Sequence, residues 1–255
     1  MNRARPFALL LAAALCGCAT ARTVSEDDRH SLERAWDGKA AYLRSSLNVL
    51  PFFGEADKRL VSPLYPDSIQ LPAGAAGAQA LLPGPVESVV PMGAQVRIEK
   101  LEFPTSLWAS PRPLHTPRGC PWVYLSLPGV PRGQTYVAVL RASMTTREEV
   151  LAALGDLFSF DEPSLWLKNA GPETRKAIEE KRLLAGMDGE QVLLSWGRPE
   201  RIRQDLESPA CPPDNASCIR SPVRVETWTW PLGVRTATFK DGRLSSAQPA
   251  LEKRD

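Results

Sequence analysis

The chain has 255 residues, of which 43% are hydrophobic and 24% charged, as in an ordinary globular protein with one large domain or two small ones. It contains two histidines and no Cys/His cluster, which argues against most zinc enzymes and most triad or dyad hydrolases. Arg3 and Arg5 precede Cys18, so the chain from Cys18 onward carries 29 basic and 29 acidic residues. Its zero net charge argues against nucleic acid as a partner.

Prolines are the unusual part of the composition. The chain has 24 of them, about twice the usual share of roughly 5%. Because proline lacks a backbone donor and interrupts helices, we expect many loops and short strands.

The beginning of the chain has the layout of a secretory signal. Residues 1–6 are short and basic, and residues 7–15 form an apolar run, which is too short to cross a hydrocarbon core of roughly 30 Å as a helix. The sequence Leu15-Cys16-Gly17-Cys18 resembles the lipobox of bacterial lipoproteins. The resemblance implies that residues 1–17 are a lipoprotein signal peptide and that Cys18 carries the lipid, palmitate among its acyl chains.

The residue after Cys18 bears on the destination of the protein. It is Ala19 rather than aspartate, which in the sorting rule of such lipoproteins implies the outer membrane, with the protein body facing the periplasm. The alternative is simple secretion after cleavage near Ala19 or Ala21. Residues 18–35 are polar and charged and predict a tether from the membrane.

Residues 36–142 predict a β-rich domain. A short helix is expected near 39–47, and aromatic or β-branched runs predict strands over 89–101, 122–127 and 136–140. Short strands separated by Pro/Gly loops indicate a small antiparallel barrel or sandwich. The turn at Pro91-Met92-Gly93 and the strand after it loosely resemble bacterial SH3-like domains.

Residues 143–171 predict a helical connector. Thr146 and Glu149 have the spacing of a capping box, in which the hydroxyl accepts the Glu149 amide proton and the carboxylate reaches back. The helix that they begin is expected to stop at Gly155.

Residues 172–246 predict a small α+β domain. A helix is expected over 173–184, with Pro172 in its first turn. A second helix begins at Asp188, which forms a capping box with Gln191, and it ends at Gly197. Met187 and Val192 occupy the two positions of a hydrophobic staple.

The end of the chain alternates as β-strands do. Strands are expected over 201–206, 223–230 and 234–239, and Asp241-Gly242 gives a hairpin signal. Two helices followed by these strands indicate helices on one face of an antiparallel sheet. Residues 247–255 are expected to form a tail.

Residues 177–246 resemble the BamE (SmpA/OmlA) family of outer-membrane lipoproteins. The match rests on Leu184-Ala185-Gly186-Met187, Gln191-Val192, Gly197-Arg198-Pro199, Glu226-Thr227-Trp228-Thr229-Trp230 and Thr238-Phe239-Lys240-Asp241-Gly242-Arg243-Leu244. The chain departs from the family pattern at Asp188, at Trp230 and in a cysteine-containing insertion. The resemblance implies an ααβββ fold and a role in β-barrel assembly.

Three cysteines follow Cys18. Cys211 and Cys218 bracket a turn-forming Pro-Pro-Asp-Asn-Ala-Ser loop, and an exported chain can keep disulfides, so we expect these two to pair. Cys120 is then a buried or half-buried thiol. The alternative is that all three are free.

The chain offers few candidates for catalysis. His115 stands between Pro113 and Pro117 and is expected to be a surface-loop histidine. We expect no catalytic residue, no cofactor and no metal. Trp228 and Trp230 point to the same side of one strand, where they either pack in the core or form an exposed patch for a protein partner.

The sequence therefore predicts a non-enzymatic lipoprotein anchored in the outer membrane through Cys18. Its expected function is binding or scaffolding in envelope or outer-membrane assembly, with a protein partner in the envelope. Two alternatives remain: a protein inhibitor, because the same small fold resembles inhibitors of cell-wall-targeting enzymes, and a peptidoglycan-binding module built on the SH3-like region.

Overall fold

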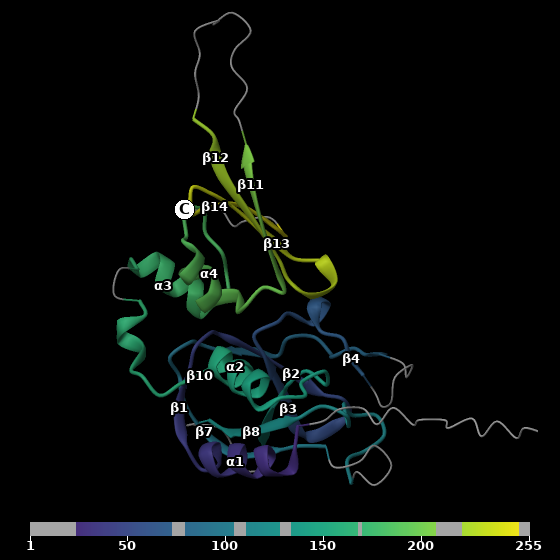
Figure 1. The fold of residues 1–255 in the computed structure, drawn as a ribbon. Helices are drawn as coiled ribbons and strands as arrows, with labels where there is room; N and C mark the ends of the chain where they lie inside the picture. The colour runs from purple at the N-terminus through teal and green to yellow at the C-terminus, as the bar shows by residue number, and fades with distance from the viewer. Residues whose placement is uncertain are drawn as a thin grey trace, which may run out of the picture.

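The computed structural model describes residues 24–72, 80–104, 111–127, 134–167, 170–207 and 221–249. They form an α+β fold with an N-terminal and a C-terminal unit, each built on a β-sheet with helices against it (Figure 1). The predicted signal peptide, the acylation site Cys18 and the predicted Cys211–Cys218 disulfide lie outside the described residues.

The N-terminal unit is built around a large sheet. Its elements are α1 (Glu26–Trp36), β1 (Ala40–Leu43), β2 (Leu47–Phe52), β3 (Glu55–Ser62), η1 (Pro66–Ser68), β4 (Leu71–Pro72), β5 (Ala80–Leu81), β6 (Ser88–Val90), β7 (Gln95–Glu102), β8 (Trp122–Ser126), β9 (Thr135–Val139), α2 (Arg147–Leu157), β10 (Phe158–Ser159) and η2 (Pro163–Leu165). Within the described ranges, eight strands form one sheet in the order β10-β1-β7-β8-β9-β3-β2-β6, while β4 and β5 pair separately. All neighbours in the large sheet are antiparallel except β3 and β9.

Alternation along these strands creates two cores. The face toward α1 and α2 carries Val49, Val61, Val123 and Ala138, and the opposite face carries Leu50, Leu60, Trp122 and Val137. The strands predicted over 89–101, 122–127 and 136–140 are confirmed as β6 to β9. The sheet is larger than the small barrel that the sequence predicts, because strands β1, β2, β3 and β10 join it.

Residues 24–35 were expected in the tether, and that expectation is wrong. Most of them form α1, where the Ser25 hydroxyl accepts a hydrogen bond from the amide of Asp28. Leu32 and Trp36 are buried against the sheet. The helix looks polar in sequence because so few of its residues face the core.

The helix predicted near residues 39–47 is also absent. The segment instead forms β1 and the beginning of β2. β1 takes its partners from β7 and β10, which lie far along the chain. Strands with such distant partners show little local sequence signal.

Residues 143–171 are part of the N-terminal unit rather than a connector. The capping box of Thr146 and Glu149 is confirmed at the start of α2. Val150, Leu154 and Leu157 are buried in the core between the large sheet and the helices α1 and α2, and α2 continues past Gly155. β10 follows directly and pairs with β1 at the edge of the large sheet.

The C-terminal unit places two helices against an antiparallel sheet. Its elements are α3 (Pro172–Glu179), α4 (Gly189–Trp196), β11 (Arg201–Glu207), β12 (Val223–Thr229), η3 (Pro231–Gly233), β13 (Thr236–Lys240) and β14 (Arg243–Gln248). Over its described residues the sheet has four strands in the order β11-β12-β13-β14, one more than the predicted ααβββ arrangement. The Asp188–Gln191 capping box is confirmed, and Met187 and Val192 are both buried in the core of this unit. Among the described helices, none has the length and apolar character needed to cross a membrane.

Candidate functional site

The two units meet around Lys181, which follows the end of α3. Its side chain is fully buried, and its Nζ donates hydrogen bonds to the carbonyl oxygens of Ser46 at 2.7 Å, Pro63 at 2.9 Å and Ser195 at 2.7 Å. The protonated lysine side chain has three N–H donors, which matches three carbonyl acceptors, whereas the neutral amine has only two. Lys181 therefore ties β2, the end of β3 and α4 to a single point.

Two opposing effects act on the pKa of Lys181. Burial, with a smaller contribution from the charge of Arg235, lowers the pKa of Lys181 well below its ordinary value. The three carbonyl acceptors oppose that change because they stabilise the protonated form. Among the described residues no carboxylate lies within hydrogen-bond reach of the Lys181 Nζ, so the three carbonyls are the groups that hold it in place.

Ser46 and Tyr65 complete this junction. The Ser46 hydroxyl donates to the carbonyl of Ile178 at 2.7 Å and accepts from the amide of Met92 at 3.0 Å. Tyr65 donates its hydroxyl proton to the carbonyl of Lys181, and the Trp196 ring nitrogen donates to the same oxygen at 3.1 Å. The side chains of Lys181, Ser46, Tyr65 and Trp196 therefore all hydrogen-bond to backbone groups within the junction, which holds the units in one arrangement.

A second contact joins the units at the surface. Arg235 makes two hydrogen bonds to Asp67, at 3.0 and 2.8 Å, and its guanidinium lies 3.7 Å from the ring centre of Tyr65. Such bidentate and stacked geometry is better defined than that of an isolated surface ion pair. It fixes η1 of the N-terminal unit against the turn that precedes β13.

An open groove runs along the junction, and we call it the seam groove. One part, of about 580 Å³, lies between β3, the segment 68–72 and Leu232. The adjoining part, of about 540 Å³, lies between α2 and the segment 197–200. Both parts are lined by Ser62, Arg141 and Glu200, so they form one continuous depression.

The seam groove has the surface chemistry of a binding site. Its walls combine apolar side chains such as Val139 and Leu232 with groups of both charges, Arg141 and Glu200. Arg198 and Asp156 form an exposed ion pair at 3.0 Å on its second part. A depression with apolar and charged walls on a fixed junction can contact a ligand both by burying apolar surface and by pairing charges.

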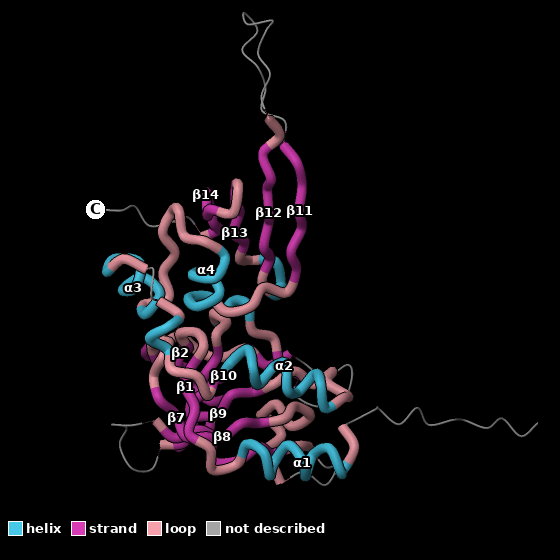
Figure 2. The backbone as a smooth tube through the Cα atoms, turned by 60° about the vertical axis from the view of Figure 1, so that its left-hand side comes forward, coloured by secondary structure: helices cyan, strands magenta, loops and turns pink. Residues whose placement is uncertain are grey.

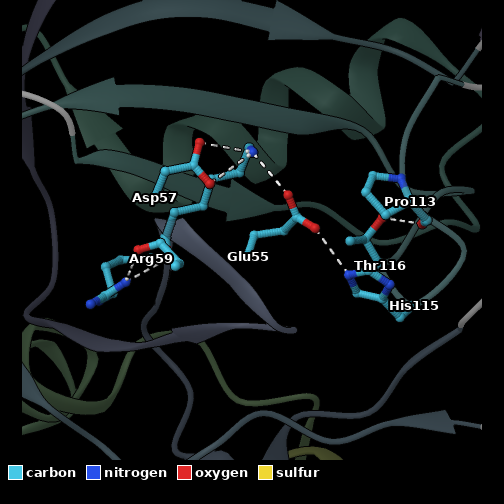
Figure 3. A network of polar contacts seen from close by, with 8 residues as sticks. Glu55, Asp57, Arg59, Pro113, His115 and Thr116 are labelled. Atoms are coloured by element: carbon cyan, nitrogen blue, oxygen red, sulfur yellow. Dashed lines mark hydrogen bonds and ion pairs between the residues drawn. The ribbon is translucent and has the colours of Figure 1, made fainter.

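His115 lies elsewhere and takes part in a surface network (Figure 3). Its Nε2 lies 3.0 Å from Oε1 of Glu55, whose other oxygen accepts a hydrogen bond from Lys58 at 3.3 Å. The hydroxyl of the neighbouring Thr116 donates to the carbonyl of Pro113 at 2.8 Å. The imidazole is 57% exposed, and no described hydroxyl or thiol is placed for it to activate, so the surface-loop interpretation fits the geometry.

The predicted aromatic patch is not on the surface. Trp228 and Trp230 are 7% and 1% exposed, and both belong to the core of the C-terminal unit. Trp228 packs against Phe239 with ring centres 4.6 Å apart, and Trp230 against Trp196 at 5.1 Å. Core packing is therefore the correct alternative, because α4 covers this face of the sheet.

Cys120 is a free, buried thiol, as predicted. Burial raises its pKa to about 12, although the nearby charge of Arg112 acts in the opposite direction. Arg112 itself donates to the Cys120 carbonyl at 2.6 Å and to Glu102 at 2.6 Å. Within the described residues, no group of three or more His, Cys, Asp or Glu side chains is arranged to hold a metal ion.

The residues that build the junction were not anticipated from the sequence. Lys181 follows Glu179 and Glu180 and so looks like part of a solvated charged face. Arg235 and Asp67 are separated by 168 positions, and nothing local marks them as partners. The segment Gly197-Arg198-Pro199 was predicted only as a helix end and as part of the BamE resemblance, and it lies on the wall of the seam groove.

Comparisons with known proteins add no family to this description. No protein-family model, curated protein or solved structure matches the chain.

Proposed function

We propose that the protein is a lipid-anchored binding or scaffold lipoprotein of the outer membrane, facing the periplasm. The lipobox-like sequence that ends at Cys18 supports the anchor. The observation that carries the binding function is the seam groove, which both units line. An acyl anchor would confine this groove to the membrane surface and raise its effective concentration near partners there.

The fixed junction beneath the groove favours binding. Lys181 holds both units through three hydrogen bonds, so the two walls of the groove need little ordering when a partner enters. A preorganised surface loses less conformational entropy on association than a mobile one. A segment of an envelope protein is the partner that we propose.

The resemblance to the BamE family adds to this proposal. Among the segments that carry it, Gly197-Arg198-Pro199 forms part of the groove wall. A role in outer-membrane assembly is what that resemblance implies, and the groove is the surface through which we propose that it acts.

Site-specific photo-crosslinking in the native membrane tests the proposal. A photoreactive residue at Arg141 or Leu232, both on the groove, should give a discrete adduct with an envelope protein. The matched control places the same residue at Arg34, an exposed position of α1. In a Cys18→Ser background the groove adduct should be lost or strongly reduced.

The outcomes separate the alternatives. Adducts of equal yield from Arg141 and Arg34 would contradict the groove as the binding surface. An adduct with a cell-wall enzyme would instead identify a protein inhibitor. Co-sedimentation of the full chain with purified peptidoglycan, prevented by Arg141→Glu, would indicate a cell-wall-binding module.

A further inference from the structure

β11 is an edge strand, and no described strand pairs with its outer side. It is the end strand of the C-terminal sheet and pairs there with β12. All its residues are exposed, including Ile202 at 51% and Leu206 at 75%. Figure 2 shows β11 and β12 projecting together, with no described element along the free side of β11. Such an edge is a template for another strand.

The sequence of β11 is complementary to itself when it is reversed. Antiparallel pairing of two copies with Gln204 opposite Gln204 brings together Arg201 with Glu207, Ile202 with Leu206 and Arg203 with Asp205. Each copy supplies both members of every pair, so each contact occurs twice. Opposite charges and apolar residues directly across two strands are stabilising pairs.

The two faces of the paired strands would also match. Residues two apart share a face, so the charged residues lie on one face and Ile202, Gln204 and Leu206 on the other. Ile202 is opposite Trp228 in β12, which places it on the face that carries the core of the C-terminal unit. A second β11 would cover part of the apolar surface that Ile202 and Leu206 now expose to water.

We propose that two copies of the protein pair antiparallel through β11, around a twofold axis at Gln204. The two four-stranded sheets then become one continuous sheet across the dimer. This is an isologous contact, closed by symmetry, so it stops at two copies. No residue of β11 lines the seam groove, which ends next to it at Glu200, and the proposal does not rest on the proposed function.

The charges of β11 make the edge selective. Charged side chains on an edge strand normally discourage pairing with other strands. Here a strand that places a like charge opposite one of the charged residues of β11 meets repulsion, whereas a second β11 meets attraction at both ends. In the isolated chain Arg203 already pairs with Asp205 at 2.8 Å, and Glu207 with Lys240 at 3.1 Å. The dimer brings the partner's charges next to these pairs and leaves none of them facing a like charge.

A cysteine scan tests the register. We would use the full chain with every cysteine except the buried Cys120 replaced by serine. Gln204→Cys should form a disulfide-linked dimer under mild oxidation, because residue 204 faces its own copy. Ile202→Cys alone should not, since its copy lies four residues along the strand, about 13 Å away, beyond the Cα separation of roughly 7 Å that a disulfide tolerates. A mixture of Ile202→Cys and Leu206→Cys chains should link.

A charge exchange tests the recognition. Arg201→Glu with Arg203→Glu makes the charged face of β11 wholly acidic, and Asp205→Arg with Glu207→Arg makes it wholly basic. Each variant alone should dimerise at least tenfold more weakly than the unchanged chain in analytical ultracentrifugation, and an equimolar mixture should recover the dimer. The control, Arg34→Glu with Arg97→Glu, changes the net charge as the acidic variant does, but at exposed positions away from β11, and should dimerise normally.

Three results would overturn the proposal. One is a chain that remains monomeric at all concentrations and gives no Gln204→Cys dimer. Another is a dimer that neither charge variant weakens, which would place the interface elsewhere. The third is linkage of Ile202→Cys alone as fast as Gln204→Cys, which would exclude this register. Because the changed side chains are exposed, circular dichroism should show an unaltered fold in every variant.

Discussion

Gly197 lies so close to Pro63 that a Cβ atom on the glycine would be 2.7 Å from the Cβ of the proline. The glycine ends α4, with φ of 76° and ψ of −173°, a backbone conformation that residues with a side chain rarely adopt. The end of α4 and the end of β3 therefore meet in contact, directly under the seam groove.

Gly197→Ala should destabilise the protein. The backbone strain alone is worth about 1–3 kcal/mol, and the overlap with Pro63 adds to it. Gly155→Ala is the matched control, because Gly155 lies inside α2 with open space around it. That change should be neutral or stabilise the protein by up to about 1 kcal/mol. Urea unfolding of both variants measures the difference, and equal stabilities would contradict the close contact.

Lys181→Met should weaken the junction. The methionine matches the side chain in length but leaves the carbonyls of Ser46, Pro63 and Ser195 without their shared donor. Each unsatisfied buried polar group costs about 1–3 kcal/mol. Lys176→Met, at an exposed position of α3, is the control and should change the melting temperature little. If both variants melt alike in calorimetry, the ammonium does not hold the units together.

The Cys120 thiol should be inert in the folded protein. Because burial raises its pKa to about 12, the thiolate that reacts with iodoacetamide is scarce at pH 8. Peptide mapping after alkylation should therefore find Cys120 modified in denaturant and unmodified without it. Rapid alkylation of the native protein would mean that the core on this face of the large sheet opens readily.

The ion pair of Glu102 with Arg112 should make the stability of the fold depend on pH. Partial burial raises the pKa of Glu102, but hydrogen bonds and charges from Lys100 and Arg112 together outweigh it and hold the pKa below its ordinary value. In the unfolded chain the carboxylate binds a proton at a higher pH than in the folded chain. The contribution of Glu102 to the free energy of unfolding is thus complete when the pH is above the ordinary pKa of the group. It is lost as the pH falls through the pKa that the group has in the folded chain.

Glu102→Gln isolates this effect. At pH 7 the variant should melt at a lower temperature than the unchanged protein, and the gap should narrow as the pH falls from 5 to 3. Thermal melts at several pH values provide the measurement. A gap that stays constant with pH would show that the side chain contributes by packing rather than by charge.

The parts of the fold that could be predicted are those whose structure is decided by residues close together in the sequence. Thr146 and Asp188 begin their helices through bonds to residues three positions away, and those two helix starts are confirmed. Strands β7 and β12, which alternate in sequence, and strands β8 and β9, which are aromatic and β-branched runs, were predicted as well. In each case the residues that decide the structure are neighbours in sequence.

The parts that could not be predicted depend on distant partners. β1 is a strand because β7 and β10 lie on either side of it. Lys181 belongs to the junction because three carbonyls from separate segments surround it. Trp228 and Trp230 could be assigned to a face but not to core or surface, because that depends on the position of α4.

The pairing of β10 with β1 at the edge of the large sheet affects how the chain folds during synthesis. β10 pairs with β1, which precedes it by more than a hundred residues, and β9 pairs with β3 across 77 positions, from Lys58 to Thr135. Closing such long loops is entropically costly and slow. A chain that emerges amino end first therefore holds β1 without one of its neighbours until residue 159 has emerged. During that interval its apolar residues Ala41 and Leu43 need protection from aggregation, as they would in any fragment that stops at residue 142.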